Sequence, residues 1–216
     1  MSVKPKLSII TICFNAESYI KPTLDSVANQ TFKDLEHVIV DGKSTDSTMI
    51  IVDSFPHIQN KVSESDNGLY DAMNKGIDRA NGEYLCFMNG GDLFYDNNTL
   101  ESVFSSSNNE DFIYGDTLVF SPEDNSTRAY HKEKPSEKTL SYKSFINGMV
   151  ICHQSMIIKK SCVEKYDDSV FKLACDIDWS IRALKNCQSF KDSGIYISRF
   201  LDGGVSQNNR WKAVRE

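Results

Sequence analysis

The first 92 residues alternate between short apolar runs and segments with helical periodicity, and this alternation limits the fold more than any other feature of the sequence. The apolar runs are rich in β-branched residues and too short for typical helices, so they predict buried strands at 7–14, 35–41 and 83–89. Between them, apolar residues at helical spacing predict helices at 17–29 and 69–80. Strands that alternate with helices predict a parallel sheet covered by helices on both faces.

The remaining elements are expected to alternate less regularly. A short helix through 49–52 is expected, with Ser44 and Asp46 as candidate N-caps, followed by a short strand at 61–65. The second half is expected to contain strands at 112–120, 148–158 and 195–200 and a helix at 178–185. Residues 121–141 are polar and rich in Pro, Ser and Lys, which is typical of an exposed loop or hairpin.

Composition favours one folded domain, because 216 residues with 40% hydrophobic content can bury a full core. The net charge of −6 makes a broad nucleic-acid-binding surface unlikely, so no nucleic-acid partner is expected. No stretch approaches the roughly 20 apolar residues of a membrane span. The six cysteines form no CxxC pair and are interpreted as buried, reduced thiols rather than as disulfides or a zinc site.

The N-terminal sequence MSVKPKLSIITICF places two lysines before an apolar run, as a signal peptide does. The run is short, contains Ser and Thr, and is not followed by a convincing cleavage site, so we interpret it as the first core strand.

Polar residues collect where the predicted strands end. The ends carry Phe14–Asn15, Asp41–Gly42, the triplet 66–68 and Asp92. In parallel sheets the ligand lies beyond the carboxyl ends of the strands, so these residues predict a binding site at one edge.

The stretch CFMNGGD, residues 86–92, ends an apolar run on a double glycine and one acid. The sequence contains neither GxxxxGK[ST] nor a GxGxxG after the first strand, so a nucleotide would not be held in the P-loop or Rossmann manner. Mg²⁺ needs only one or two carboxylates when phosphates supply its other ligands. Asp92 is therefore either a metal ligand or an ordinary turn residue.

Four segments, taken in order, resemble family 2 of the inverting glycosyltransferases: VDGKSTDST (40–48), ESDNGLYDAMNKGIDRANGEYLCFMNGGD (64–92), ICHQS (151–155) and ACDIDW (174–179). The resemblance extends from about residue 6 to about residue 206 and is closest to the bacterial branch that assembles capsule, O-antigen and exopolysaccharide repeat units.

The resemblance implies the GT-A fold, in which a Rossmann-like, mostly parallel central α/β sheet is flanked by helices, with a smaller antiparallel elaboration on the acceptor side. It implies a single domain over 1–216, with a nucleotide-sugar-binding half at about 6–95 and an acceptor-binding half at about 96–216.

The resemblance assigns donor contacts to ten positions at strand ends, on the following helix or next to them. Uridine contacts would come from Thr11, Phe14, Asn15 and Asp41, although ordinary strand packing is the alternative for Thr11 and Phe14. Ribose and diphosphate contacts would come from Asp66, Gly68, Asp71, Asn74 and Lys75. Lys75 could instead pair with Asp71 one helical turn away. Gly91 would let the backbone pass close to the donor.

The metal ion implied by the resemblance is Mg²⁺ or Mn²⁺ at Asp92, with His153 as a further ligand or a diphosphate contact. The sequence departs from the family's Asp-x-Asp motif, because Gly90 stands where the first acid is expected. Asp176 would be the general base, with Asp178 as the second choice. An N-cap role for Asp176 is the alternative.

The implied activity is transfer of a sugar from a nucleoside-diphosphate sugar, expected to be a UDP-sugar, to a glycan or lipid-linked acceptor in surface polysaccharide synthesis. A catalytically inactive nucleotide-sugar-binding module of an assembly complex is the alternative. A sugar nucleotidyltransferase fits less well, because its Gly-rich basic N-terminal signature is missing.

The expected location is cytoplasmic, at the inner face of the cell membrane for lipid-linked acceptors. The segment 210–216, RWKAVRE, is basic with a Trp and is compatible with peripheral membrane association. A homodimer is compatible with the resemblance as well.

Overall fold

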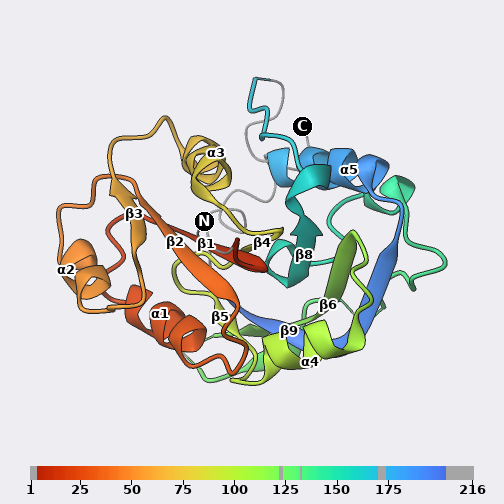
Figure 1. Ribbon diagram of the computed structural model, residues 1–216, viewed down its shortest axis with the longest axis horizontal. Coiled ribbons are helices and arrows are strands. Elements are labelled where there is room, and N and C mark those ends of the chain that lie inside the picture. The colour runs from red at the N-terminus through yellow and green to blue at the C-terminus, as the bar shows by residue number, and fades with distance from the viewer. Residues whose placement is uncertain (1–3, 122–123, 132, 170–173, 203–216) are drawn as a thin grey trace.

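The computed structural model describes residues 4–121, 124–131, 133–169 and 174–202. In these ranges the chain forms one mixed sheet with helices on both faces (Figure 1). The strands are β1 (Leu7–Cys13), β2 (Leu35–Asp41), β3 (Asn60–Ser63), β4 (Tyr84–Phe87), β5 (Leu93–Phe94), β6 (Phe112–Phe120), β7 (Thr127–Ala129), β8 (Met156–Lys159) and β9 (Phe190–Leu201). The helices are α1 (Ile20–Ala28), α2 (Thr48–Asp53), α3 (Leu69–Arg79), α4 (Thr99–Ser106) and α5 (Cys175–Asn186), with short 3₁₀ turns η1 (Tyr142–Phe145), η2 (His153–Ser155) and η3 (Lys160–Cys162).

The strand order is β3-β2-β1-β4-β8-β6-β9-β5, and β7 pairs with β6 at the side. The pairings of β1 with β2 and β4, of β2 with β3, and of β6 with β9 are parallel. Strand β8 is antiparallel to both β4 and β6, so β6 and β9 run in the same direction as β1. The mostly parallel α/β sheet with an antiparallel elaboration is therefore confirmed.

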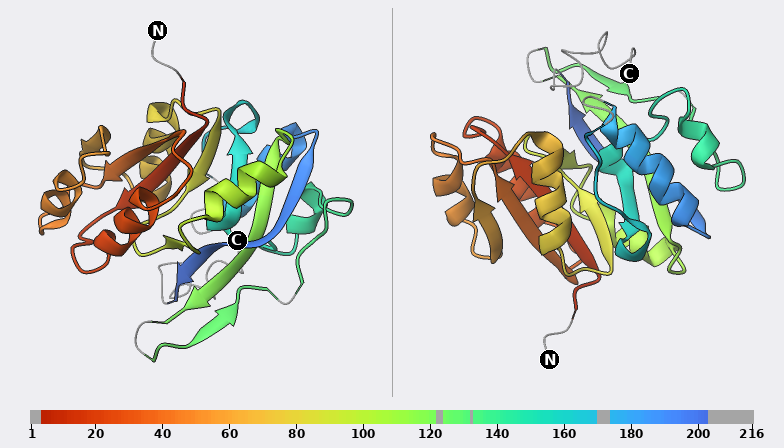
Figure 2. Two further views of the ribbon diagram at one scale, coloured as in Figure 1. Left: turned by 60° about the horizontal axis from the view of Figure 1, so that its bottom comes forward. Right: turned by 90° about the horizontal axis from the view of Figure 1, so that it is seen from above.

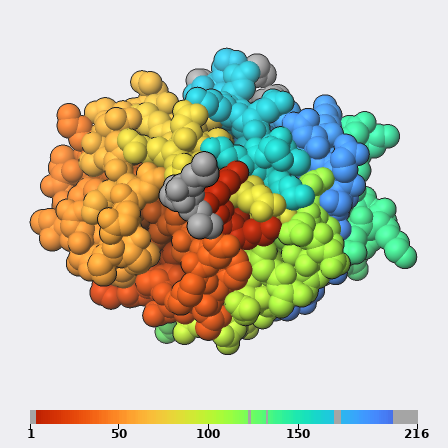
Figure 3. Space-filling model, viewed as in Figure 1, coloured from red at the N-terminus to blue at the C-terminus, as the bar shows by residue number. Residues whose placement is uncertain are grey.

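Each face of the sheet is covered by a different set of helices (Figure 2). One core joins Ile10 and Ile12 of β1 to α3 and α5, because alternate strand residues point to one face. The opposite face packs Leu7 and Ile9 against α1 and α4, while α2 packs beside the strand ends with α1. On the face drawn in Figure 3, residues of the two halves form one continuous surface, from red and yellow into green and blue.

The helix and strand predictions for the first 92 residues are confirmed in type and order, with ends that differ by a few residues. The predicted strand at 148–158 is wrong in its first part, because residues 153–155 form the turn η2 and the strand covers only Met156–Lys159. In this turn the side chains of His153 and Gln154 leave the strand alternation and contact Tyr166 and Asp92. The polar segment 121–141 does form a hairpin, in which β7 pairs with β6.

All six cysteines are free and buried, as predicted. Among the residues that the structure describes, no helix is long and apolar enough to cross a membrane. The basic segment 210–216 lies outside the described residues.

Candidate active site

The ends of β1, β2 and β3 converge around Phe14, Gly42 and Asp66. A Cβ atom added at Gly42 would lie 2.7 Å from Asp66 Oδ2 and 3.3 Å from the Phe14 ring, so both side chains lie close to this glycine. Phe14 is 60% exposed and Asp66 is half-buried. This edge of the sheet therefore presents an aromatic ring and a carboxylate side by side.

Thr11 and Asp41, both expected to contact the donor, are fully buried instead. The Thr11 hydroxyl donates a hydrogen bond to the Met88 carbonyl oxygen at 2.7 Å. The Asp41 carboxylate accepts hydrogen bonds from the Ser44 backbone N–H at 2.9 Å, from the Ser44 hydroxyl and from the Ser63 hydroxyl at 2.5 Å. Both side chains are engaged by protein partners at the strand ends, and their expected donor contacts stay predictions.

Asn15 connects the loops that follow β1 and β2. Its backbone N–H donates to the Ser44 hydroxyl oxygen at 2.8 Å, and its Oδ1 accepts the Thr45 N–H at 2.9 Å. Its φ of +46° lies in the left-handed region, which Asn tolerates better than most residues. The exposed Asn15 therefore holds the loop that carries Phe14.

The turn before α3 is fixed by two carboxylates. Asp66 Oδ1 accepts the Gly68 N–H, and Asp71 Oδ2 accepts the Asn67 N–H, each at 2.9 Å. Gly68 has a φ of +122°, which strongly favours glycine. Asp66, in this turn, lies close to Phe14. Asp66, Gly68 and Asp71 are therefore brought together at the same edge of the sheet.

Lys75 points back to the segment before α3 and is engaged there. Its ammonium group lies 2.8 Å from the Ser65 carbonyl oxygen, 3.1 Å from Glu64 and 3.6 Å from Asp71. The alternative of an i, i+4 ion pair with Asp71 is therefore borne out, and a diphosphate contact would require Lys75 to leave these partners.

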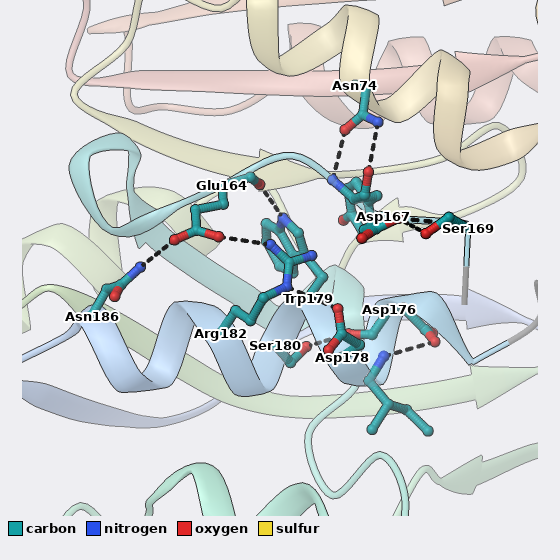
Figure 4. Close-up of polar contacts among 12 residues, drawn as sticks. Asn74, Glu164, Asp167, Ser169, Asp176, Asp178, Trp179, Ser180, Arg182 and Asn186 are labelled. Carbon is teal, nitrogen blue, oxygen red and sulfur yellow. Dashed lines mark hydrogen bonds and ion pairs between the residues drawn. The ribbon is translucent and has the colours of Figure 1, made fainter. Parts of the chain in front are cut away.

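Asn74 points away from the strand ends and holds the backbone of Tyr166 (Figure 4). Its Nδ2 donates to the Tyr166 carbonyl oxygen at 3.0 Å, and its Oδ1 accepts the Tyr166 N–H at 2.7 Å. Both polar atoms of the Asn74 amide are used by this contact, and the expected donor contact stays a prediction.

Asp92 is 5% exposed and lies between the two halves of the sheet. Its Oδ2 accepts a hydrogen bond from Gln154 Nε2 at 2.7 Å, and its Oδ1 accepts the Leu201 N–H at 3.0 Å. Burial raises the pKa of Asp92 to about 7, although both hydrogen bonds act in the opposite direction. A buried carboxylate of this kind gains the most from a cation, which replaces its lost hydration.

Gly91, next to this acid, has a φ of +103°. A Cβ atom there would lie 2.8 Å from the Leu201 side chain, which together with the positive φ favours glycine beside β9. The expected close approach of this backbone to the donor stays a prediction. At Gly90 an added Cβ would meet its neighbours at 3.4 Å or more, which is ordinary contact.

The protein side chains at this site fit a divalent cation that takes most of its ligands from a diphosphate. In the described part of the chain, no group of three or more His, Cys, Asp or Glu side chains could hold a metal ion. His153 Nε2 lies 2.6 Å from the Tyr166 hydroxyl, and the expected role of His153 as a metal ligand or diphosphate contact stays a prediction. Its ring packs against Phe87 and Trp179, and burial lowers its pKa to about 4, which keeps it neutral. Among the described residues, Asp92 is the carboxylate proposed to meet the cation, and one carboxylate is sufficient for Mg²⁺ when phosphates supply its other ligands.

Asp176 and Asp178 lie in the first turn of α5 but differ in their partners (Figure 4). Asp178 forms an i, i+4 ion pair with Arg182 at 2.8 Å, and Arg182 also contacts Glu164 at 3.1 Å. Asp176 Oδ1 accepts only a backbone N–H, that of Ile177, among the described residues outside its own backbone. The N-cap position belongs to Ala174, without a side-chain cap, so the capping alternative for Asp176 is not supported.

Burial raises the pKa of Asp176 to about 6. The group is therefore ionised at neutral pH, yet more basic than an exposed aspartate, which suits a general base. Asp178 is engaged by a cation and is less suited to accept a proton from a substrate.

Cys152 is joined to Asp92 through Gln154. Its thiol donates to Gln154 Oε1 at 3.0 Å, and Gln154 holds Asp92. Burial raises the pKa of Cys152 to about 12, and the negative charges of Asp92 and Asp176 both contribute to this shift.

Two residues that the sequence did not single out complete this centre. Gln154 orients Asp92, and its place directly after His153 in ICHQS was the available signal. Tyr166 connects His153 to Asn74 and stacks on Trp179 with ring centroids 4.9 Å apart. Nothing in the local sequence pattern around Tyr166 indicates this role.

Comparison with known proteins assigns the family. The profile of "Glycosyl transferase family 2" matches residues 8–167. A PGL/p-HBAD biosynthesis glycosyltransferase of Mycobacterium bovis is 31% identical over 192 residues, covering 84% of this chain and 71% of that protein. The putative teichuronic acid biosynthesis glycosyltransferase TuaG of Bacillus subtilis is 37% identical over 93 residues, covering 41% of this chain and 37% of TuaG.

Two solved structures show the same fold at lower identity. S. aureus TarS 1–349 in complex with UDP has a TM-score of 0.71 at 19% identity and covers 97% of this chain. The mannosyltransferase PcManGT from Pyrobaculum calidifontis, in complex with GDP-Man and Mn²⁺, has a TM-score of 0.71 at 17% identity and covers 99% of this chain. This chain spans 63% and 61% of the lengths of those two chains.

The matched profile covers most of the chain. The sheet topology brings the ends of the neighbouring strands β1, β2 and β3 to one edge. The chain therefore belongs to glycosyl transferase family 2 and has the GT-A fold.

Proposed function

We propose that this glycosyltransferase transfers a sugar from a UDP-sugar to a hydroxyl group of a glycan or lipid-linked acceptor, with inversion at the anomeric carbon. The observation that carries the proposal is a pair of acids in this family 2 glycosyltransferase, the buried Asp92 and the half-buried Asp176, that have different partners and pKa values raised by burial. Two acids with different partners are suited to different tasks in one reaction.

Asp176 is proposed as the general base. It accepts the proton of the acceptor hydroxyl while the hydroxyl oxygen forms a bond to the anomeric carbon. The bond from that carbon to the diphosphate oxygen breaks, and the diphosphate leaves with the electron pair. Attack from the side opposite to the leaving group inverts the configuration. A pKa of about 6 keeps Asp176 ionised and able to accept a proton at neutral pH.

Asp92 is proposed to hold Mg²⁺ or Mn²⁺ together with the donor diphosphate. When bound, such an ion neutralises negative charge on the leaving diphosphate. The protein orients the carboxylate, because Gln154 and the Leu201 N–H donate hydrogen bonds to its two oxygens. Residues that orient a metal ligand in this way commonly matter nearly as much as the ligand.

The nucleoside is proposed to lie against the edge formed by Phe14, Asn15 and Asp66, with Gly68 and Asp71 shaping the turn behind it. Phe14 offers an exposed ring for stacking on a base. The UDP and UDP-GlcNAc complexes of S. aureus TarS support uridine as the nucleoside.

The acceptor is proposed to bind in the second half, residues 96–202 of the described chain. The names of the relatives from Mycobacterium bovis and Bacillus subtilis, which act in biosynthesis of PGL/p-HBAD and of teichuronic acid, support a glycan or glycolipid acceptor. A lipid-linked acceptor would place the enzyme at the cytoplasmic face of the membrane.

Calorimetric titration with UDP, with and without Mn²⁺, combined with an assay of UDP release from UDP-sugars, tests the proposal. We expect Mn²⁺-dependent UDP binding and turnover that EDTA abolishes. Tight binding of UDP without turnover against any acceptor pool would favour the inactive nucleotide-sugar-binding module. Absence of UDP binding would contradict the proposed donor.

A further inference from the structure

A cavity of about 210 Å³ lies in the second half of the sheet, beside the proposed centre. Its walls come from β6, from the segment after β7, from residues 150–152 and from β9. The side chains with recognition chemistry are those of Asp116, Tyr130, His131, Lys134, Cys152 and Tyr196. We propose that this cavity binds an uncharged sugar ring of the acceptor, an inference that rests on the proposed glycosyltransferase function.

The cavity shares a wall with the reaction centre. Cys152 lines the cavity, and its thiol donates to Gln154 Oε1 at 3.0 Å. Gln154 in turn donates to Asp92 at 2.7 Å. An acceptor sugar in this cavity is therefore separated from the proposed metal ligand by Cys152 and Gln154.

The lining matches the chemistry of a pyranose ring. Tyr130 and Tyr196 offer aromatic surface for the C–H groups of a sugar, while Asp116 and Lys134 offer charged hydrogen-bonding groups for its hydroxyls. The volume is smaller than the roughly 300–1,000 Å³ of pockets for drug-sized ligands. A single sugar ring suits this size better than an extended oligosaccharide does.

The polar groups are held in place before any ligand arrives. The Lys134 ammonium group lies 2.6 Å from Asp116 and 3.1 Å from Asp192, and only 14% of its side chain is exposed. Tyr196 stacks on Tyr95 with ring centroids 5.2 Å apart. Preorganised groups lose less entropy on binding, so this wall is built to recognise a ligand.

The charges favour a neutral ligand. The single ammonium group of Lys134 is already compensated by two carboxylates, and Asp116 remains 40% exposed. A uronate or a phosphate would meet Asp116 without a free cation among the described lining residues. A hydroxyl-bearing neutral sugar can instead donate to Asp116 and accept from Lys134.

Saturation-transfer NMR with methyl hexopyranosides and methyl glucuronopyranoside tests this inference on the full chain. The wild-type protein should give signals with neutral glycosides and at least about tenfold weaker binding of the glucuronide, a difference of about 1.4 kcal/mol. D116N should weaken neutral-glycoside binding about tenfold, and E133Q should leave it unchanged, because the exposed Glu133 lies one residue from Lys134 but does not line the cavity.

A second variant covers the case in which D116N is unstable. Ala129→Trp fills the cavity from the exposed end of β7 and should abolish glycoside signals without changing the melting temperature by much. Three results would overturn the inference. The wild type could give no signals with any neutral glycoside, the Ala129→Trp variant could bind glycosides as well as the wild type does, or the wild type could prefer the glucuronide. UDP affinity, measured by calorimetry in the same samples, should not change in these variants. Loss of UDP binding in the wild type would contradict the proposed function instead.

Discussion

Gln154 donates a hydrogen bond of 2.7 Å from Nε2 to Oδ2 of Asp92, and the backbone N–H of Leu201 donates to the other carboxylate oxygen at 3.0 Å. The Asp92 carboxylate is therefore oriented by two segments that are distant in the sequence. Its place in the proposed reaction depends on this orientation as well as on its charge.

Replacing Gln154 by Ala should lower UDP release about 10- to 100-fold, because orienting partners of metal ligands commonly contribute that much. UDP affinity without Mn²⁺ should change little, since Gln154 is not proposed to touch the nucleoside. Gln188→Ala provides the matched control, because the exposed Gln188 side chain lies at the far end of α5. Equal Mn²⁺-dependent kinetics in the Gln154 variant and the wild type would refute the orienting role.

Asp92→Asn should stabilise the metal-free protein at pH 8 while abolishing turnover. The pKa of Asp92 rises from 3.8 to about 7 on folding, because burial favours the protonated carboxyl group in the folded protein. The free energy of unfolding is therefore at its full value below pH 3.8, where the group is protonated in both states. It decreases as the pH rises from 3.8 towards 7. Each pKa unit corresponds to about 1.4 kcal/mol, which makes a gain on the order of 2–4 kcal/mol reasonable.

Urea denaturation at pH 5 and pH 8 in EDTA measures this gain. The stabilisation by Asp92→Asn should be larger at pH 8 than at pH 5, because the ionised carboxylate is then fully buried without a partner cation. A variant that is less stable than the wild type at pH 8 would contradict the pKa assignment.

Asn74→Ala should lower stability by about 1–3 kcal/mol and leave UDP affinity within about twofold. The reason is that both polar atoms of the Asn74 amide bind the Tyr166 backbone, so the change leaves a backbone N–H and carbonyl without partners. Thermal melting and calorimetry on one sample separate the two effects. A large loss of UDP affinity in a variant of normal stability would instead support the donor contact that the sequence predicts for Asn74.

The two glycines before Asp92 should respond differently to Ala. Gly91→Ala should cost on the order of 1–3 kcal/mol, because its φ is +103° and an added Cβ would lie 2.8 Å from Leu201. Gly90→Ala should change stability by less than about 1 kcal/mol, because the added Cβ meets only ordinary contacts. Equal melting temperatures for both variants would contradict this packing account of Gly91.

The parallel first half was predictable because each strand there is a continuous apolar run bounded by polar residues. The order of β8, β6 and β9 was not, because it depends on long-range pairing that no local pattern reveals. The turn η2 was missed for a related reason: ICHQS is apolar enough for a strand, but His153 and Gln154 bind Tyr166 and Asp92 from distant segments.

The candidate site was predictable to the level of strand ends. Phe14 and Asp66 meet where parallel strands end, and family resemblance indicated Asp92 and Asp176. Thr11 and Asp41 are buried and hydrogen-bonded to protein partners at 2.7 and 2.5 Å, which their place in the sequence does not reveal. Such tertiary burial does not follow from residue type or spacing.

Sugar transfer by Asp176→Asn and Asp178→Asn, compared under saturating UDP-sugar and Mn²⁺, tests the assignment of the general base most directly. We expect the Asp176 variant to lose at least about 100-fold in rate, the lower end of the range for general-base catalysis, with unchanged UDP affinity. The Asp178 variant should keep its rate within about tenfold, because Asp178 is paired with Arg182. Unchanged transfer by the Asp176 variant, or an equal loss in both, would contradict the assignment of Asp176 as the base.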